Sequence, residues 1–388
     1  MPDRLRIVVA GGLGAMPFAG ITWQVMHYLE GFRRLGHEVF YLEDTQRWPY
    51  DPFRETVADD AGPVLEYVSE KLSRCGLGDA WAYVDIAQQG RVHGASEKQL
   101  RQALETADVL VNVAGVMVLR DEHLRVPVRV YLETDPVLPQ IEVAQGNQTT
   151  IDILAAHTHH YTYGENFGAP DCTVPIERFQ YRPTRPPVIL DWWAASTVPE
   201  LDGRPFTTVA NWRQTSKDVV WKGRKLTWSK DVQFERLLPL PARAPVPIEL
   251  ALATADEQAM TMLRGAGWHV RPAAPLSKDL DGYRDYIRSS AGEFSVAKEQ
   301  YALLRSGWLS DRTVCYLAAG LPAIVQDTGV ACALPVGEGL LPFSTLEQAV
   351  AAFDSVTSDY QRHATAARAI AEEYLSAERV LGDLIAGL

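Results

Sequence analysis

The segment SGWLSDRTVCYLAAGLPAIVQDTG, residues 306–329, places polar residues at the start of a predicted helix and at the end of a predicted strand. A small polar turn leads into a short helix, and Gly320 and Pro322 end it. An apolar strand follows at 322–327. The two polar edges comprise Ser310, Asp311 and Arg312 at the helix start, and Gln326, Asp327, Thr328 and Gly329 at the strand end. We expect both edges to face one ligand.

Apolar strands alternate with helices throughout the chain. The first half has predicted strands at 5–10, 38–43, 108–115, 128–135 and 159–164, with helices from Thr22 to Gly36, around 60–75 and near 96–106. The second half has predicted strands at 206–212, 247–253, 268–273, 293–298 and 322–327, with helices between them and two terminal helices, one opened by a capping box of Ser344 and Glu347. Such alternation indicates parallel sheets covered on both faces, which is an α/β fold.

A stretch rich in proline and tryptophan at 181–205 has neither helical nor strand periodicity. A chain of 388 residues is also too long for one ordinary core. We therefore predict two tandem Rossmann-type domains that face a central cleft. The predicted parts are a domain at 1–185, a connector at 186–204 partly packed by Trp192 and Trp193, a domain at 205–370 and a terminal helix at 371–388.

The composition disfavours some partners. The net charge is -12 and the pI is about 5.3, so the surface repels nucleic acid and anionic membranes. The chain enters a strand directly after MPDRL, without the pattern of a signal peptide, and no apolar run approaches a membrane span. The four cysteines are Cys75, Cys172, Cys315 and Cys332, and their wide spacing indicates reduced thiols. We expect a cytoplasmic protein without nucleic-acid or membrane partners.

Ligands of open α/β sheets bind beyond the carboxyl ends of the strands, so the residues there are the first candidates. Gly12 and Gly14 follow the first strand and allow close approach of a ligand to the backbone. A nicotinamide fingerprint would need a third glycine where Pro17 stands, and Asp44 comes too late for its acidic residue. A ligand-facing loop is the favoured interpretation, and a simple tight turn stays open.

Two residues of the first half are candidates for acid–base chemistry. Asp135 ends a strand and could act as a general base towards a hydroxyl, or it could only cap the turn that follows. His159 could form a hydrogen bond on the acceptor side. The histidines of HTHHY, 157–161, lack further ligands at helpful spacing, so we expect no metal site.

Cations follow the strands of the second half. Arg213, Lys230, Lys298 and Arg312 are candidates to bind phosphate groups, although lysines on a surface are more often simply solvated. Lys298 and Arg312 are the stronger candidates because they flank the turn into the quoted helix.

The segment YLAAGLPAIVQDTG resembles the EAMAAGxPVIASDxGG segment of GT-B-fold glycosyltransferases that use nucleotide sugars. FRRLGHEVF at 32–40 and the order of the elements are also similar over nearly the whole chain. Many members with a retaining mechanism carry two glutamates here, and those positions are Gly307 and Cys315 in this chain. The histidine of plant-type inverting members is absent from GGLGAMPFAG, 11–20, so the stereochemical outcome is open.

The resemblance implies a metal-independent hexosyltransferase that moves a sugar from a nucleoside-diphosphate sugar, such as UDP-glucose, to a hydroxyl of a small acceptor, without another cofactor. It implies donor contacts from the two polar edges, the four cations, Gly12 and Gly14, with Glu293 on ribose or base hydroxyls. The acceptor would lie near Asp135 and His159. An epimerase of the same fold, a nicotinamide-dependent oxidoreductase and a two-domain binding protein are the alternatives. The oligomeric state is open.

Overall fold

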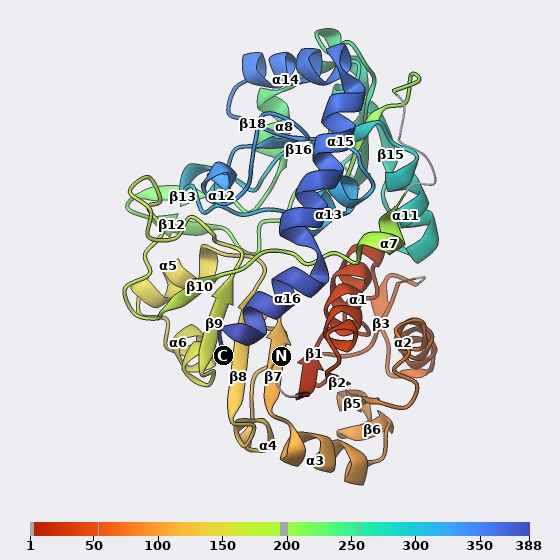
Figure 1. The fold of residues 1–388 in the computed structure, drawn as a ribbon, viewed down its shortest axis with the longest axis vertical. Helices are drawn as coiled ribbons and strands as arrows, with labels where there is room; N and C mark the ends of the chain where they lie inside the picture. Colours follow the sequence, from red (N-terminus) through yellow and green to blue (C-terminus); the bar gives the residue numbers. More distant parts are fainter. Residues whose placement is uncertain (1–3, 53, 195–200, 255) are drawn as a thin grey trace.

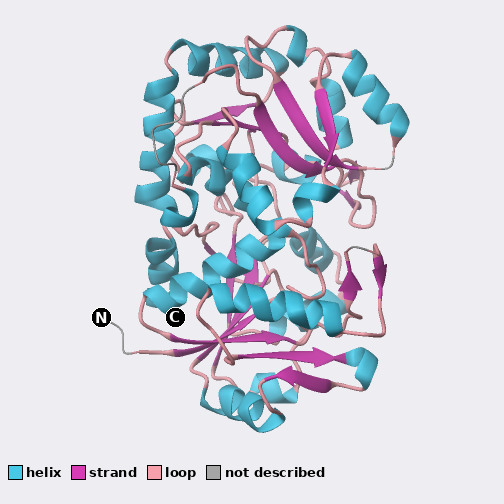
Figure 2. Cartoon of the chain, turned by 90° about the vertical axis from the view of Figure 1, so that its right-hand side faces the viewer, coloured by secondary structure: helices cyan, strands magenta, loops and turns pink. Residues whose placement is uncertain are grey.

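Two parallel sheets, each covered by helices, form the protein, as the alternation of strands and helices predicts (Figure 1). The computed structural model describes residues 4–52, 54–194, 201–254 and 256–388. The first sheet comes from the first half of the chain and the second from the second half, and Figure 2 shows one sheet below the other. The α/β architecture of two tandem Rossmann-like halves is therefore confirmed.

The first sheet has eight strands in the order β10-β9-β8-β7-β1-β2-β5-β6. Neighbours are parallel except β5 and β6, which pair antiparallel at one edge. The strands are β1 (Arg6–Ala10), β2 (Glu38–Glu43), β5 (Trp81–Asp85), β6 (Arg91–Gly94), β7 (Val109–Val113), β8 (Val128–Glu133), β9 (His159–Thr162) and β10 (Tyr181–Pro183). The helices are α1 (Ala19–Arg34), α2 (Gly62–Arg74), α3 (Glu97–Thr106), α4 (Asp121–Leu124), α5 (Leu138–Ala144) and α6 (Gln148–Ala155). A small hairpin of β3 (Tyr50–Asp51) and β4 (Thr56–Val57) follows β2.

The second sheet has six parallel strands in the order β15-β14-β11-β16-β17-β18. They are β11 (Phe206–Asn211), β14 (Ile248–Ala253), β15 (His269–Pro272), β16 (Gly292–Ser295), β17 (Ala323–Gln326) and β18 (Leu340–Phe343). The helices are α8 (Asp231–Arg236), α9 (Glu257–Gly265), α10 (Ala274–Ser277), α11 (Leu280–Arg288), α12 (Glu299–Leu303), α13 (Asp311–Ala318), α14 (Leu346–Ser358) and α15 (Tyr360–Ile370). A hairpin of β12 (Val219–Trp221) and β13 (Arg224–Leu226) projects between β11 and α8.

The predicted capping box of α14 is one residue out of register. Thr345 accepts a hydrogen bond from the backbone N–H of Gln348 at 3.2 Å, and the Gln348 side chain accepts one from the N–H of Ser344 at 2.7 Å. The pair is therefore Thr345 with Gln348 and not Ser344 with Glu347. The Thr345 side chain satisfies one of the N–H groups that a helix start leaves unpaired.

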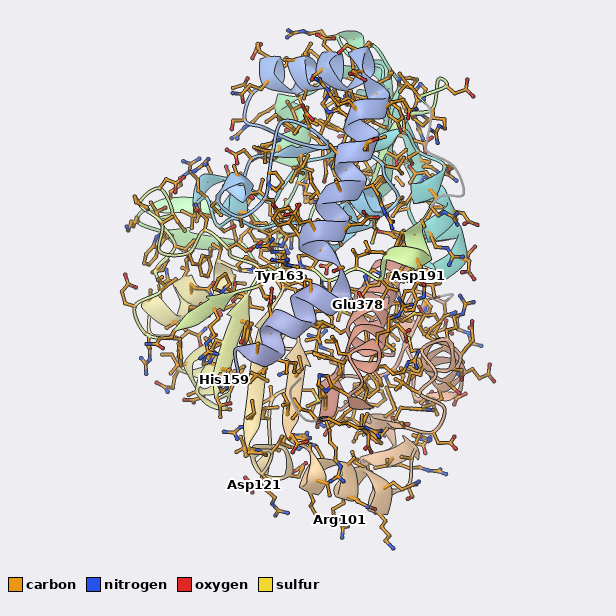
Figure 3. All side chains as sticks on the ribbon, in the orientation of Figure 1. Arg101, Asp121, His159, Tyr163, Asp191 and Glu378 are labelled. Carbon is orange, nitrogen blue, oxygen red and sulfur yellow. The ribbon has the colours of Figure 1, made fainter. Side chains whose placement is uncertain are left out.

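The connector and the end of the chain tie the two halves together. The connector helix α7 (Leu190–Trp193) buries Trp193 completely, and the indole of Trp192 lies 5.7 Å from that of Trp23, measured between ring centroids. Asp191 of α7 and Glu378 of α16 (Ala377–Ala386) are labelled in Figure 3. Both pair with Arg34 of α1, at 2.6 and 3.6 Å.

The helix α16 returns to the first half after α15 and a π-helical turn at Ala371–Leu375 (Figure 1). It packs against α1 at Gly31, where an added Cβ would lie 2.5 Å from the Leu381 side chain and 2.9 Å from Ala377. Strand β10 ends at Pro183 and β11 begins at Phe206, but the exact domain boundaries stay a prediction.

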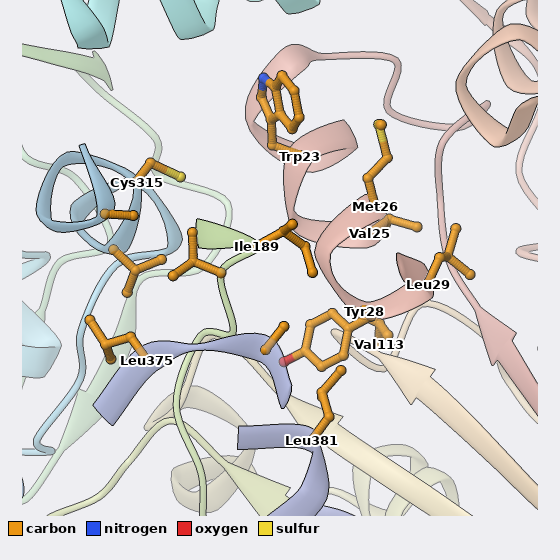
Figure 4. Packing of buried hydrophobic residues seen from close by; sticks show 14 of the residues in the cluster. Trp23, Val25, Met26, Tyr28, Leu29, Val113, Ile189, Cys315, Leu375 and Leu381 are labelled. Carbon is orange, nitrogen blue, oxygen red and sulfur yellow. The ribbon is translucent and has the colours of Figure 1, made fainter. Parts of the chain in front are cut away.

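One apolar cluster runs through both halves. It joins Trp23 and Tyr28 of α1 to Cys315 of α13, with Ile189 of the connector between them and Leu381 of α16 below Tyr28 (Figure 4). The halves therefore share a core and are not two separate globules. None of the helices in the described part of the chain has the length and apolar character needed to cross a membrane.

Candidate active site

A cavity of about 590 Å³ lies between the two halves. The first half contributes the start of α1 and the β3–β4 hairpin, and the second half contributes the carboxyl ends of β11 and β14, helices α10 and α11, and the start of α13. Aromatic, polar and ionisable side chains line much of it, among them Trp23, Gln24, His27, Tyr50, Glu55, Lys278, Tyr283, Ser310, Asp311, Arg312 and Cys315. Its size is that of a small-molecule site.

The predicted helix edge lines this cavity. Ser310 caps α13 by accepting a hydrogen bond from the N–H of Arg312 at 3.2 Å. Cys315 lies one turn after Asp311 and also lines the cavity, at a position where the resembled family often has glutamate. Burial raises the pKa of Cys315 well above its usual value, so the thiol stays protonated. The helix start therefore offers the cavity the hydroxyl of Ser310 and the carboxyl of Asp311.

Asp311 belongs to a polar network that spans both halves. Its carboxyl accepts hydrogen bonds from Gln24 Nε2 at 2.9 Å and from the Tyr163 hydroxyl at 3.2 Å. Tyr163 in turn lies 2.6 Å from the Tyr28 hydroxyl, and Figure 3 labels Tyr163 near the level where the halves meet. Burial raises the pKa of Asp311 to about 7, against the lowering effect of these hydrogen bonds.

Arg312 lines the cavity but directs its guanidinium into the second half. It pairs with Glu293 at 2.8 Å and also donates to the Val209 carbonyl at 2.6 Å and to Ser295 Oγ at 2.7 Å. Glu293 is completely buried on β16. The prediction that Glu293 binds ribose or base hydroxyls is therefore wrong, because its carboxylate neutralises Arg312 inside the fold.

Lys230 and Lys298 form a group of cations with Arg312. Burial lowers the pKa of Lys230 well below its usual value, and the charges of Arg312 and Lys298 lower it further. Among the residues that the structure describes, none forms an ion pair or hydrogen bond with the Lys230 ammonium. A partly buried ammonium without a partner is costly, and a bound anion would supply the missing partner.

Asp135 pairs with Lys298 across the two halves. The Lys298 ammonium lies 2.7 Å from Asp135 Oδ1, and the Tyr301 hydroxyl donates to the same oxygen at 2.5 Å. Lys298 also stands 3.4 Å from the centroid of the Trp228 ring. Burial alone would raise the pKa of Asp135, but Lys298 lowers it to about 2. A carboxylate with so low a pKa is a poor general base, which argues against the predicted catalytic role.

The predicted strand edge does not line the large cavity. Gln326 bonds Gln233 at 2.8 Å, and Thr328 donates to the Trp308 carbonyl at 2.7 Å. Asp327 pairs with Arg305 at 2.8 Å and accepts from the N–H of Gly329 at 2.8 Å. These contacts hold the turn at 305–308 against β17. Gln326 and Thr328 line a second, small cavity of about 20 Å³ together with Ser310, so the expectation that both edges face one ligand stays a prediction.

The backbone N–H groups of the glycine-rich loop after β1 donate hydrogen bonds to side chains of β2. The N–H groups of Gly14 and Ala15 donate to the Glu43 carboxyl at 2.8 and 2.7 Å, and Leu13 donates to the Tyr41 hydroxyl at 3.0 Å. Neither Gly12 nor Gly14 lines the cavity among its described residues. An added Cβ on Gly14 would lie 2.5 Å from Val64, so this glycine serves packing. The bonds to Glu43 argue against the predicted donor contact of Gly14, and the donor contact of Gly12 stays a prediction.

Two further predicted residues lie elsewhere. His159 begins β9, opposite Val130, so it stands at the amino end of the strand, and Figure 3 shows it well below Tyr163. The expectation that it faces the acceptor is wrong. Arg213 is exposed and pairs with Asp231 at 2.7 Å and Asp256 at 3.7 Å.

Sequence reasoning did not single out several residues at the cavity. Gln24, His27 and Tyr50 line it from the first half, and an ion pair of 3.0 Å between Glu55 and Lys278 crosses from one half to the other at its rim. The signal for Gln24 and His27 was the presence of polar residues on an otherwise apolar helix. Nothing in the sequence indicates the pairing of Glu55 with Lys278.

One group of side chains has metal-ligand spacing. Oxygen and nitrogen atoms of Asp44, Glu122 and His123 lie within 4.8 Å of one another. The guanidinium of Arg120 pairs with both carboxylates, so a protein cation already occupies the space between them. The group lies outside the cavity lining.

No family model and no curated protein matches the chain. Solved structures do match it. An alpha-glucosyltransferase in complex with UDP and a 13-mer DNA containing a HMU base is 10% identical, with a TM-score of 0.56 and 99% of each chain covered. AviGT4, a glycosyltransferase involved in avilamycin A biosynthesis, is 12% identical, with a TM-score of 0.51 and coverage of 99% of this chain and 96% of that one.

A glycosyltransferase from Rickettsia africae ESF-5 is 9% identical, with a TM-score of 0.53 and coverage of 99% and 97%. At such identities the likeness establishes the fold. The chain has the two-domain GT-B-type fold of these glycosyltransferases.

Proposed function

We propose that this chain, which has a GT-B-type fold, transfers a hexose from a nucleoside-diphosphate sugar to a hydroxyl group of a small acceptor. A cavity of about 590 Å³ between the halves supports the proposal, because a two-substrate transfer needs both reactants held together away from water. Structures of the alpha-glucosyltransferase that it resembles contain UDP or UDP-glucose.

The observation that carries the proposal is the ammonium of Lys230, which lies beside Arg312 and Lys298 and has no partner among the described residues. Arg312 has Glu293 as its counter-ion and Lys298 has Asp135, so Lys230 is the cation of this group that a diphosphate would neutralise. The start of α13 adds a positive helix end at Ser310. These groups can stabilise a diphosphate leaving group without a metal ion, and no cofactor beyond the nucleotide sugar enters the proposal.

The proposal also names UDP-glucose as the donor and the cytoplasm as the location. UDP-glucose is the donor to test first, because similar folds have been solved with UDP and with UDP-glucose. A reducing, cytoplasmic location agrees with the four cysteines, none of which forms a disulfide within the chain.

The acceptor is proposed to be a small hydroxylated molecule. Phe18, Trp23 and Tyr50 line the cavity and would pack against a ring-bearing acceptor. The net charge of -12 opposes a polyanion. DNA remains the second candidate, because the alpha-glucosyltransferase with a similar fold was solved with bound DNA.

The alternatives fit the site less well. A nicotinamide-dependent oxidoreductase would bind pyrophosphate at the N–H groups of the glycine loop, but Glu43 already accepts their hydrogen bonds. An epimerase would need no acceptor pocket, whereas aromatic residues of the first half line the cavity opposite the start of α13. A binding protein without catalysis would bind the nucleotide sugar and leave it intact.

The first experiment measures binding and hydrolysis of UDP-, TDP-, GDP- and ADP-glucose. Lys230→Ala should weaken binding of the preferred nucleoside diphosphate by about 1.5–3 kcal/mol, the range for a charged hydrogen bond. Lys222→Ala is the matched control, since Lys222 is exposed on the β12–β13 hairpin, over the Trp221 ring. Isothermal titration calorimetry measures the affinity of both variants for the nucleoside diphosphate. Failure of the unchanged protein to bind any of the four nucleotides would refute the proposal.

The second experiment concerns the acceptor. The protein is incubated with the preferred donor and either a panel of phenols and small sugars or a 13-mer DNA duplex, and release of the nucleoside diphosphate is measured. Faster release with small hydroxylated compounds supports the proposed acceptor class. Faster release with DNA alone would identify DNA, and not a small molecule, as the acceptor.

A further inference from the structure

We infer that Asp311 is the general base that deprotonates the acceptor hydroxyl. The inference rests on the proposed sugar transfer and identifies a residue that acts in it. Asp311 lines the cavity at the first residue of α13, and its carboxyl is held by Gln24 and Tyr163 of the opposite half. Each oxygen of a carboxylate can accept two hydrogen bonds, so the group retains capacity for a substrate hydroxyl.

The other titratable groups of the cavity lining are unsuited to the role. His27 accepts a hydrogen bond from the Trp193 indole at 3.0 Å, and burial lowers its pKa to about 3. Glu55 is paired with Lys278 and is two-thirds exposed, at 66% of its side chain. Burial raises the pKa of Tyr283 and of Cys315, which keeps both protonated. Asp311 is thus the carboxyl among the described lining residues that has no cationic partner.

The electrostatic surroundings of Asp311 suit a base that works near neutral pH. A group that removes a proton works best when its pKa lies close to the working pH, and burial brings that of Asp311 to about 7. The titratable or charged groups that face it are Tyr28 of α1, Tyr163 after β9, Asp135 after β8, Tyr283 of α11, and Arg312 and Cys315 of its own helix. Asp135 raises the pKa of Asp311 through its negative charge, and the Gln24 and Tyr163 hydrogen bonds lower it.

The proposed step needs only the acceptor, the nucleotide sugar and Asp311. The proton of the acceptor hydroxyl passes to a carboxylate oxygen of Asp311 while the acceptor oxygen forms a bond to C1 of the sugar. The bond from C1 to the phosphate oxygen breaks, and its electron pair leaves on the nucleoside diphosphate. Asp311 then releases the proton to solvent.

The test compares Asp311→Asn, Asp311→Glu and the unchanged protein in the release of nucleoside diphosphate from the preferred donor, with water as the acceptor. Loss of a general base should slow release by roughly 100–10,000-fold, and Asp311→Glu should recover part of it. Sodium azide is the second nucleophile, because it needs no deprotonation and should restore release in Asp311→Asn. Asp121→Asn is the control variant, because this carboxylate is exposed and outside the cavity lining, and it should be as active as the unchanged protein.

A pH profile separates a base from a residue that only supports the fold. The kcat/KM of the unchanged protein should rise with pH through about 7, because Asp311 must lose its proton to act. Tyr163→Phe removes a hydrogen bond that lowers the pKa of Asp311, so its profile should shift to higher pH. This variant leaves the carboxyl in place, and thermal unfolding of each variant shows that it is folded.

Three results would overturn the inference. They are unchanged release by Asp311→Asn, an unshifted profile in Tyr163→Phe, and weaker nucleotide binding by Asp311→Asn without rescue by azide, which would make Asp311 a donor-binding group. Nucleotide affinity is measured in every variant. If the unchanged protein binds no nucleotide, the proposed transfer itself fails, and if it binds but uses neither water nor azide, the most active compound of the acceptor panel serves in the same comparison.

Discussion

Arg312 lines a cavity and nevertheless has its charge balanced inside the fold. Its position in the sequence, at a helix start beside a predicted cleft, correctly placed it at the cavity wall. The sequence could not show that Glu293, nineteen residues earlier, is its partner, because a strand pattern does not reveal which buried side chain meets which. Lys230 is the opposite case, since the sequence offered it only weakly and the structure leaves its ammonium unpaired.

The buried ion pair of Arg312 and Glu293 can be tested by its effect on stability. Arg312→Ala should lower the free energy of unfolding by about 3–5 kcal/mol, because it leaves a completely buried carboxylate without its counter-ion. Urea denaturation measures the loss. The double variant Arg312→Met with Glu293→Leu removes both charges and should recover most of the stability. A single variant as stable as the unchanged protein but weaker in nucleotide binding would restore Arg312 to the donor site.

At the scale of elements, most of the sheet strands were predicted from the sequence, but β5 and β18 were not, although WAYVD and LLPF are largely apolar. Strand β2 was predicted at its exact bounds, and β7 is apolar except for Asn112 because both faces of the sheet are covered. The antiparallel edge strand β6 was missed because RVHG is short and largely polar. The contacts of the 326–329 edge within the protein were not predicted, since its partners Arg305 and Gln233 lie in other elements whose packing no local pattern encodes.

The close contact between α1 and α16 predicts opposite effects for two glycine substitutions. Gly31→Val should destabilise the protein by about 1–3 kcal/mol, because its side chain would overlap Leu381 and Ala377. Gly382→Ala is the matched change on α16, where an added Cβ meets nothing within 4 Å. It should stabilise the protein by about 0.5–1 kcal/mol through helix propensity. Equal unfolding midpoints for the two variants would contradict the close packing.

At the scale of the whole molecule, the shared core determines how the protein unfolds. The apolar cluster contains residues of α1, α13 and α16, and the connector supplies Ile189 and Trp193. Two-domain proteins often unfold in two steps, but a continuous core couples the halves.

We expect one calorimetric transition whose measured enthalpy equals the van't Hoff enthalpy, at low and at high salt. Burial of apolar side chains, which salt does not screen, provides most of the coupling between the halves. Two resolved transitions would show that the halves unfold independently. Separation of the transitions only at high salt would attribute the coupling to the ion pairs that cross the boundary, such as Arg74 with Asp281 at 2.9 Å.

The return of α16 to α1 also has a consequence during synthesis. A ribosome makes α1 more than three hundred residues before it makes Ala377–Ala386. Until then the Gly31 face of α1 has no partner, so the first half emerges as a sheet with one of its helices incompletely covered. Exposed apolar surface on a growing chain is a target for chaperones and a cause of aggregation. The first half is therefore translated early but completes its packing last.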